Sequence, residues 1–426
     1  MDCEVFVYVH TGETPQLAGR LWARTRRSRQ SATFEYDPAW LDHPERFSLE
    51  PALTLAAGPF HTAPDKSLFG AIGDSAPDRW GRVLMRRAER RRALAAGEMP
   101  RALTEIDYLL MVHDEARQGA LRFATQEGGP FLAPEDGHPI PPLVDLPRLL
   151  GAADRVGSDS ESDEDLRLLL APGSSLGGAR PKASIRDRDA SLAIAKFPQR
   201  DDEIDTVRWE AVALSLAARA GIPVPEWRLE DVAGRPALVL RRFDRQGGHR
   251  IPFLSAMSML DARDHEPRSY MEFADILRQY GAAPQKDMRA MWRRIVFSVL
   301  ISNTDDHLRN HGFLHDGPDG WRLAPAYDLN PVPTDIKPRV LETAIDLEGA
   351  TASLDLALSV ADYFELARDD ARAIAAEVGQ AVSEWRAAAR SVGLANSEIQ
   401  RMASAFEHED LRAATARRPA APRQPD

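Results

Sequence analysis

The sequence places an acidic residue and an asparagine five positions apart, directly after an apolar helical stretch. Residues 291–301 are strongly apolar, and Asp305 and Asn310 follow them in the run NTDDHLRN. This spacing matches a phosphoryl-transfer loop of the kinase type, in which the aspartate accepts a hydroxyl proton and the asparagine holds Mg²⁺. Asp328 follows a hairpin-like segment eighteen residues after Asn310, in the position of a second Mg²⁺ ligand. Taken alone, each acid is typical of a helix cap or a turn, so the prediction depends on their order and spacing together.

Two further features fit the binding of phosphate groups. An apolar strand over residues 191–195 ends in Lys196, and Glu210 on the following predicted helix is placed to pair with that lysine. About ten residues before the strand, the run SSLGGARPK (174–182) combines two glycines with hydroxyl groups and two cations, which suits phosphate binding. This run lacks the Gly-x-x-x-x-Gly-Lys-Ser/Thr pattern, so a Walker P-loop is excluded. A strand-end lysine or a glycine-rich loop is a weak signal by itself.

The elements that would position these residues differ along the chain. Apolar and polar residues alternate within residues 5–36, which predicts a small antiparallel meander. An Arg/Ala/Leu-rich helix is predicted to end at Gly97. Residues 167–243 mix short strands with an amphipathic helix over 206–220, and residues 270–408 are mostly helical. A mixed lobe followed by a helical lobe is one of the arrangements that hold a nucleotide in the cleft between them.

We therefore predict an α+β fold with two lobes, similar to a protein kinase, with an N-terminal β-meander subdomain and an all-helical C-terminal lobe. The predicted parts are residues 1–105 (meander plus helix), 106–243 (mixed nucleotide-binding lobe), 244–408 (helical catalytic lobe) and 409–426 (disordered tail). The Pro/Gly-rich residues 126–147 are interpreted as a connection. The acidic residues 158–165 are interpreted as a solvated loop, with regulatory phosphorylation or a partner contact as the alternative.

Composition limits the classes of partner. The 426 residues contain 54 Lys+Arg and 65 Asp+Glu, a net charge of −11, which disfavours a general binder of nucleic acid or anionic membranes. The single cysteine, Cys3, cannot form an internal disulfide, and no Cys/His spacing fits a zinc site. The longest apolar run of interest, 295–301, is far shorter than the roughly 20 residues that span a bilayer. With an acidic start and no signal-peptide pattern, we expect a cytoplasmic protein without a membrane segment.

Through these motifs the sequence resembles the HipA-family serine/threonine kinases, the toxins of type II toxin–antitoxin modules. The resemblance covers about residues 4–400 and depends on five motifs in the family's order. These are GDSAPDRWG (73–81), SLGGARPK (175–182), RFDR (242–245), DDHLRN (305–310) and YDL (327–329).

The resemblance implies ATP and Mg²⁺ as cofactors and assigns roles to individual residues. Asp305 would be the catalytic base, Asn310 and Asp328 the Mg²⁺ ligands, and Lys196 the phosphate-binding lysine. Phe243 would lie near the adenine, and His307 would orient the catalytic loop by hydrogen bonding. The implied glycine-rich loop contacts to the nucleotide are Ser175, Gly177, Gly178, Ala179 and Lys182. Arg241 and the pair Arg180–Pro181 depart from the best-known member, so a side-chain contact to adenine and the loop's dynamics need not carry over.

The resemblance also implies regulation and partners. Ser175, or Ser174 next to it, matches the loop serine whose autophosphorylation inactivates studied members. A phosphoserine there would add about 1.5 to 2 negative charges beside the triphosphate and repel ATP. The expected partner is a helix-turn-helix antitoxin similar to HipB that carries most of the DNA contact, with a local arginine run (86–92) as a weaker candidate. The expected substrate is a protein, for example an aminoacyl-tRNA synthetase.

Other interpretations stay open at this point. A small-molecule phosphotransferase of the aminoglycoside or choline kinase type shares the Asp-x-x-x-x-Asn pattern, although the meander and the GDSAPDRWG motif argue against it. A catalytically silent binding protein or corepressor is a third possibility. The GDSAPDRWG motif either docks the N-terminal part onto the rest or contacts the active site, and Trp80 is expected to pack rather than to bind a ligand.

Overall fold

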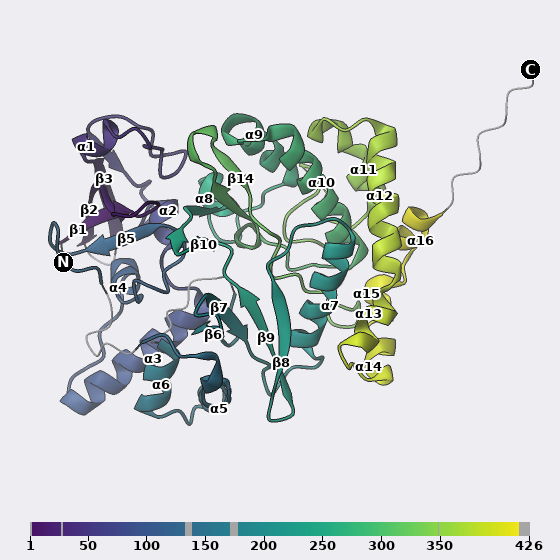
Figure 1. Cartoon of the computed structure of the whole chain (residues 1–426), viewed down its shortest axis with the longest axis horizontal. Helices are drawn as coiled ribbons and strands as arrows, with labels where there is room; N and C mark the ends of the chain where they lie inside the picture. Colours follow the sequence, from purple (N-terminus) through teal and green to yellow (C-terminus); the bar gives the residue numbers. More distant parts are fainter. Residues whose placement is uncertain (1, 27–28, 133–138, 171–177, 348, 417–426) are drawn as a thin grey trace, which may run out of the picture. The chain divides into compact units, whose positions relative to one another are not determined.

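A computed structural model describes residues 2–26, 29–132, 139–170, 178–347 and 349–416 (Figure 1). The chain divides into two compact units, and each is assembled from three separate stretches. Unit 1 comprises residues 1–203, 225–266 and 308–324, and unit 2 comprises residues 204–224, 267–307 and 325–426. The chain therefore passes from unit 2 to unit 1 within the DDHLRN motif, after His307.

The predicted N-terminal meander is confirmed as part of a five-stranded antiparallel sheet in unit 1. Its strand order is β4-β3-β2-β1-β5. The strands are β1 (Asp2–Val9), β2 (Gln16–Arg26), β3 (Arg29–Tyr36), β4 (Pro59–His61) and β5 (Leu121–Ala124). Val5, Val7 and Val9 are buried, as their alternation predicts, but Phe6 and Tyr8 on the other face are also buried. Both faces of β1 are therefore covered.

A second antiparallel sheet in unit 1 carries the strand that ends in Lys196. Its order is β6-β7-β9-β8, with β6 (Lys182–Arg186), β7 (Leu192–Lys196), β8 (Trp227–Val232) and β9 (Arg235–Arg241). The helices α3 (Arg79–Ala96), α5 (Leu146–Gly157) and α6 (Asp163–Leu170) share one apolar core with this sheet. As predicted, α3 ends at Gly97, whose left-handed φ of 66° suits glycine.

The prediction that residues 244–408 are all helical is wrong for its first part. Five short strands lie there: β10 (Arg245–Gln246), β11 (His249–Arg250), β12 (Phe253–Ser255), β13 (Gly312–His315) and β14 (Trp321–Leu323). A three-stranded sheet has the order β12-β13-β14, and these strands belong to unit 1. Strand β13 pairs with β12, which lies almost sixty residues earlier, and local periodicity cannot reveal such a pairing.

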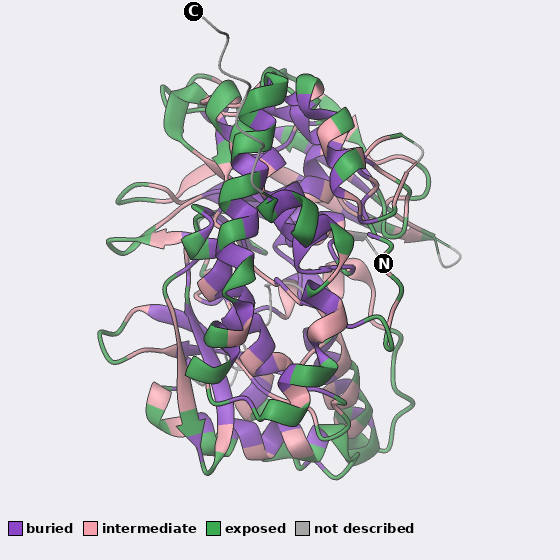
Figure 2. Ribbon diagram, turned by 90° about the vertical axis from the view of Figure 1, so that its right-hand side faces the viewer, coloured by how far each residue is buried: buried purple, intermediate pink, exposed green. Residues whose placement is uncertain are grey.

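Unit 2 contains helices and no named strand among its described residues. Its first helices are α7 (Thr206–Arg219), α9 (Tyr270–Tyr280) and α10 (Pro284–Leu300). Those that follow are α11 (Leu354–Ser359), α12 (Arg368–Ser383), α13 (Trp385–Ser391), α14 (Asn396–Arg401), α15 (Ala403–Phe406) and α16 (Glu409–Thr415). Helix α10 contacts α9, α11 and α12, and most of its residues from Met288 to Leu300 are buried. Figure 2 shows that the helices of the chain carry buried residues beside exposed ones. No helix in the described part of the chain is long and apolar enough to cross a membrane.

Two predicted loops are partly helical instead. The tail predicted over 409–426 begins as helix α16, which buries Leu411 and pairs Asp410 with Arg339 at 2.8 Å, whereas residues 417–426 lie outside the described part. The acidic stretch 158–165 is largely exposed, as predicted, but its last residues belong to α6 and two of its acids, Glu161 and Asp165, are buried. Glu161 is buried and pairs with Arg87 of α3 at 2.9 Å. The arginine run of α3 thus neutralises the acidic stretch, which charge counting cannot show.

Candidate active site

The loop that carries Asp305 leaves α10 through a tight, buried turn. Ser302 has a left-handed φ of 53°, and the Asn303 N–H donates to the carbonyl oxygen of Ser298 at 2.9 Å. Residues 302–304 are fully buried, whereas Asp305 is exposed. A rigid apolar helix and a buried turn therefore present one carboxylate to solvent.

Asp306, the neighbouring acid, anchors this loop from inside. Its buried carboxylate accepts hydrogen bonds from the Tyr270 hydroxyl and, at 2.9 Å, from the Ser298 hydroxyl. Its backbone carbonyl accepts from the Thr343 hydroxyl at 2.7 Å. Burial, together with the Asp306 carboxylate, raises the pKa of Tyr270 well above its ordinary value. The role of Asp306 could not be predicted from the sequence, because Tyr270 and Thr343 lie more than thirty positions away.

Desolvation and charged side chains of both signs influence the pKa of Asp305. Partial desolvation raises the pKa of Asp305 above its ordinary value, and the carboxylates of Asp328 and Glu342 raise it further. His307 and Lys337 act in the opposite direction. The Asp305 and Asp328 carboxylates therefore lie close enough to interact. A raised pKa brings a general base closer to neutral pH, where proton transfer is most efficient.

Asp328 adopts a conformation that non-glycine residues rarely take. Its φ is 56°, in the left-handed region, where asparagine and aspartate are the most tolerated of the larger residues. The following segment is fixed to the Asp305 loop, because the Asn330 N–H donates to the side-chain oxygen of buried Asn303 at 3.0 Å. Backbone outliers of this kind cluster at functional sites when the surroundings enforce them.

The segment after Asp328 brings two further charged residues to the Asp305 loop, and local spacing does not predict them. The Lys337 ammonium donates to the carbonyl oxygen of Thr304 at 3.3 Å, and Glu342 contributes to the field around Asp305. Both lie more than thirty positions from Asp305 and belong to no recognised spacing. Only the folding of the segment beside the loop brings them there.

His307 is half-buried in unit 2, close enough to Asp305 to influence it electrostatically. Its Nδ1 atom is buried and has no hydrogen-bond partner among the residues that the structure describes. The orienting hydrogen bond expected for His307 is therefore not seen, and its observed influence on Asp305 is electrostatic.

In unit 1 the two candidate phosphate-binding lysines lie opposite each other. Lys196 is the last residue of β7, and its cross-strand partner is Lys182, the first residue of β6. Lys182 forms an ion pair with Asp78 at 2.8 Å, and the two side chains are only 4% and 5% exposed. Its ammonium also donates to the carbonyl oxygen of Gly178 at 3.4 Å. Ala179 follows Gly178, whereas Ser174, Ser175 and Gly177 lie outside the described residues.

The GDSAPDRWG motif connects this sheet to the elements before it. Asp78 caps α3 by accepting from the Gly81 N–H at 2.9 Å, in addition to pairing with Lys182. The Trp80 indole N–H donates to the carbonyl oxygen of Lys182 at 3.0 Å, and its ring joins the apolar core of the sheet. Asp74 accepts from the backbone N–H and hydroxyl of Ser255 at 2.7 and 2.8 Å. These contacts support the docking interpretation of the motif and the packing expected of Trp80.

Two further predicted residues lie in unit 1. Asn310 is buried at the end of the short 3-10 helix η2 (Leu308–Asn310). Phe243 is half-buried, with its ring centroid 6.3 Å from that of Phe253. The site residues thus divide into a group in unit 2 (Asp305, His307 and Asp328) and a group in unit 1 (Gly178, Ala179, Lys182, Lys196, Phe243 and Asn310).

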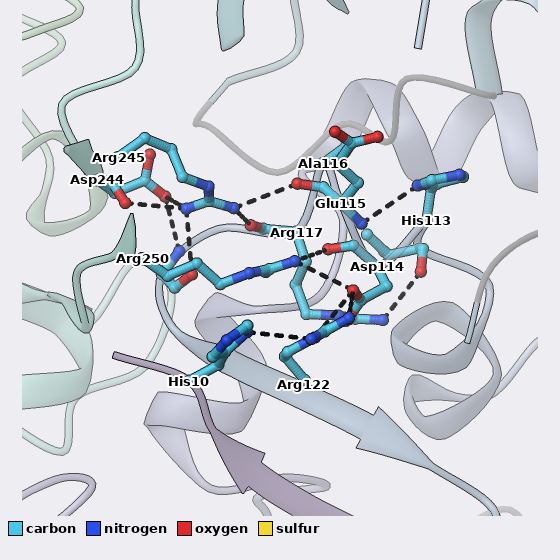
Figure 3. A network of polar contacts seen from close by, with 12 residues as sticks. His10, His113, Asp114, Glu115, Ala116, Arg117, Arg122, Asp244, Arg245 and Arg250 are labelled. Atoms are coloured by element: carbon cyan, nitrogen blue, oxygen red, sulfur yellow. Dashed lines mark hydrogen bonds and ion pairs between the residues drawn. The ribbon is translucent and has the colours of Figure 1, made fainter. Parts of the chain in front are cut away.

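The RFDR motif forms a buried ion-pair network in unit 1 (Figure 3). The Arg242 Nε atom donates to Asp244 at 2.7 Å, and both side chains are almost inaccessible to solvent, at 0% and 1% exposed. Burial opposes ionisation of Asp244, but Arg242 and Arg245 reverse this effect and hold the pKa of Asp244 well below its ordinary value. Asp244 also accepts from the Gly119 N–H at 2.8 Å.

The network continues through Asp114. Its carboxylate pairs with Arg122 at 2.6 Å and with Arg250 at 3.1 Å, and Arg122 contacts His10 at 3.0 Å (Figure 3). The network therefore joins β1, β5, β11 and the turn after β9 within unit 1. Because its charges are paired and buried, its role is structural.

The donor set fits Mg²⁺ better than a metal held by protein ligands alone. Among the described residues, no cluster of three or more His, Cys, Asp or Glu side chains could hold a metal ion. Mg²⁺ typically takes one or two carboxylates and completes its shell with phosphate oxygens and water. The half-buried carboxylate of Asp328 beside Asp305 suits this pattern.

Two family models match the chain, and both describe domains of HipA. Residues 174–386, half of the chain, match the HipA-like C-terminal domain, and residues 8–115 match the HipA N-terminal domain. A Sinorhizobium fredii protein named "Putative kinase Y4mE" is 27% identical over 327 residues, which cover 70% of this chain and 71% of that protein. A Haemophilus influenzae protein named "Putative kinase" is 30% identical over 135 residues, 28% of this chain and 39% of that protein.

A solved structure has the same fold. A chain of the Shewanella oneidensis complex of HipA, HipB and operator DNA is 17% identical, with a TM-score of 0.67 over 96% of both chains. At this identity the likeness concerns the fold alone.

Proposed function

Because the chain belongs to the HipA family, we propose that it is an ATP- and Mg²⁺-dependent protein serine/threonine kinase that limits itself by autophosphorylation. The observation that carries this proposal is that a buried, hydrogen-bonded turn leaves Asp305 exposed, with the Asp328 carboxylate near enough to influence its pKa. Their order and spacing are those of a kinase base and a Mg²⁺ ligand. The relatives named as kinases support the same activity class.

Asp305 acts as the general base in this proposal. Its carboxylate accepts the proton of the substrate hydroxyl as the hydroxyl oxygen bonds to the γ-phosphorus of ATP. The bond between that phosphorus and the bridging oxygen breaks, and ADP leaves with the electron pair. Partial desolvation, with smaller contributions from the Asp328 and Glu342 carboxylates, makes Asp305 a stronger base than a fully solvated aspartate.

Other residues bind and orient the nucleotide. Asp328 and Asn310 would hold Mg²⁺, which supplies neutralisation of the phosphate charge. Lys196 would bind the phosphates, Phe243 would contact the adenine, and the backbone of Gly178 and Ala179 would face the phosphates. Lys182 is less suited to a direct contact than the sequence implies, because Asp78 already neutralises it in a buried ion pair.

Autophosphorylation on Ser175, with Ser174 as the alternative, completes the proposal. A phosphoserine in the glycine-rich loop would repel the triphosphate. We assign the protein a helix-turn-helix antitoxin similar to HipB as its partner, a protein substrate such as an aminoacyl-tRNA synthetase, and a place in the cytoplasm. The net charge of −11 favours DNA contact through the partner, and Arg87 and Arg91 of the arginine run are engaged by acidic residues.

The test is incubation of the purified chain with ATP and Mg²⁺, followed by intact-mass and peptide mass spectrometry. We expect one phosphate on Ser175 or Ser174, and none in the Asp305→Ala variant. ATP binding without any phosphorylation of the chain or of added proteins would contradict the proposal. It would direct attention to small-molecule acceptors of the aminoglycoside or choline type.

A further inference from the structure

Lys337 places a half-buried ammonium group beside the Asp305 loop. The ammonium donates to the carbonyl oxygen of Thr304, the residue before Asp305, at 3.3 Å. Among the residues that the structure describes, no carboxylate lies within ion-pair distance of the ammonium, although its charge lowers the pKa of Asp305. Partial burial of a cation without a paired anion costs desolvation free energy. Such a group suits an anion that binds from solvent.

The position of Lys337 is fixed by the segment that carries it. The Lys337 N–H closes a turn onto the carbonyl oxygen of Pro333 at 3.2 Å. Two residues later, Arg339 donates to the Ser302 hydroxyl and to the carbonyl oxygen of Val299, both at 3.0 Å. The segment is thus attached to the end of α10 and to the turn before Asp305, so the lysine is held in place.

The other cations of this region are already engaged. Arg339 pairs with Asp410 at 2.8 Å. Arg294 is buried, and burial lowers the pKa of its guanidinium to about 10, with Asp287 as its nearest compensating charge. Lys337 is therefore the lysine beside the base whose charge is not taken up by a carboxylate.

We propose that Lys337 is a further catalytic residue, whose ammonium binds the phosphoryl group while it passes from the nucleotide to the substrate hydroxyl. This inference rests on the proposed kinase function. As the hydroxyl oxygen bonds to phosphorus, the bond to ADP breaks and the proton moves to Asp305. Negative charge is then spread over the three equatorial oxygens of the phosphoryl group. An ammonium fixed beside the base stabilises that charge without reorganising.

The kinetic test compares Lys337→Met, Lys337→Arg and a matched control, Lys286→Met. Lys286 is exposed in the first turn of α10 in the same unit. We expect Lys337→Met to lower kcat by about 10²-fold, the typical effect of removing one donor to a transition state. The KM for ATP should stay within about 3-fold of wild type, because the ammonium acts mainly in the transition state. Lys337→Arg should restore part of kcat, and Lys286→Met should behave as wild type.

A binding measurement gives a readout that does not depend on turnover. ADP with Mg²⁺ and aluminium fluoride mimics the transferring phosphoryl group, and its affinity can be compared with that of ADP and Mg²⁺ alone by calorimetric titration. We expect Lys337→Met to weaken binding of the aluminium fluoride complex by about 10²-fold and to leave ADP binding and the thermal unfolding midpoint unchanged.

The outcomes separate the two proposals. Equal aluminium fluoride affinity and equal kcat in wild type and Lys337→Met would overturn the role of Lys337 and leave the kinase function standing. A loss of kcat accompanied by a lower unfolding midpoint, and not restored by arginine, would show a structural role and also overturn the inference. Absence of phosphoryl transfer in the wild-type chain would overturn the kinase function, and the inference with it.

Discussion

In unit 1 the RFDR network surrounds its buried carboxylates with arginines, whereas in unit 2 the Asp305 carboxylate is exposed and is influenced by charges of both signs. Asp244 is enclosed by Arg242 and Arg245, and its pKa is held low. The Asp305 side chain is exposed, yet partial desolvation raises its pKa; Asp328 and Glu342 add to this effect, and His307 and Lys337 oppose it. A buried ion pair makes the fold depend on both partners, because removal of one leaves a buried charge uncompensated, whereas a surface carboxylate with a raised pKa marks a candidate functional site. The contrast separates residues that hold the chain together from residues that act on a substrate.

The largest expected effect is on catalysis, from Asp305→Ala. We expect phosphoryl transfer to fall by about 10³-fold or more, because the general base is lost. The thermal unfolding midpoint should stay close to that of wild type, since the removed carboxylate is exposed and is influenced by charges of both signs. Phosphate incorporation by mass spectrometry and scanning calorimetry provide the two readouts. A variant that kept wild-type phosphoryl transfer, or that unfolded more easily than wild type, would contradict the view that Asp305 serves catalysis and not the stability of the fold.

The largest expected effect on stability comes from Asp244→Ala. Removal of this carboxylate leaves Arg242 buried without its charge partner, which typically costs about 3 to 5 kcal/mol of unfolding free energy. The matched control is Asp316→Ala, which breaks an exposed pair with Arg322 and should cost less than about 1 kcal/mol. Urea unfolding of each purified variant measures the difference. Similar unfolding free energies for the two variants would show that the network is not what stabilises unit 1.

The sequence predicted the parts of the site that depend on local order. Asp305 follows the apolar helix α10, and Lys196 is the last residue of strand β7, as the sequence predicts; their chemical roles belong to the proposed function. The meander, α3 and α7 were also readable, because apolar periodicity and the stops at Gly97 and Gly221 are local signals.

The rest depended on contacts between distant parts of the chain. Asp306 anchors the loop through Tyr270, and Lys337 reaches Thr304 only after its segment folds against α10. The acidic stretch before α6 looked solvated because its arginine partners lie about seventy residues earlier. No periodicity or spacing rule encodes such pairings, and the strands β12 to β14 were missed for the same reason.

A smaller effect is expected from the pair that joins the GDSAPDRWG motif to β6. Asp78→Asn keeps the helix cap but removes the charge, and Lys182→Met removes the other partner. Each single variant removes one member of the buried ion pair and keeps the charge of the other, so the double variant should be more stable than additivity allows. We expect a coupling of about 2 kcal/mol in a double-mutant cycle of urea unfolding.

The same variants test which of the two lysines of unit 1, Lys182 or Lys196, contacts the nucleotide. If Lys182 only holds β6 in place, the double variant should bind ATP within about 3-fold of wild type, whereas Lys196→Met should bind it at least 10-fold more weakly. Calorimetric titration with ATP and Mg²⁺ measures both affinities. Additive losses of stability, or a double variant that folds but fails to bind ATP, would place Lys182 among the nucleotide contacts.

Glu50 is, like Asp74, a buried carboxylate of unit 1 outside the arginine network, and it gives the most specific prediction. It accepts a hydrogen bond from the Ala71 N–H but has no arginine partner, and burial raises its pKa to about 8. In the unfolded chain the pKa of a glutamate is about 4.3. Between these values the folded state holds a proton that the unfolded state releases, so stability falls as pH rises through this window.

Glu50→Gln is neutral at every pH and should lose this dependence. We expect its unfolding free energy relative to wild type to grow by more than about 1 kcal/mol between pH 5 and pH 8, since one pKa unit corresponds to about 1.4 kcal/mol. Parallel pH profiles for the two proteins in urea unfolding would mean that Glu50 is ionised and compensated, as Asp244 is.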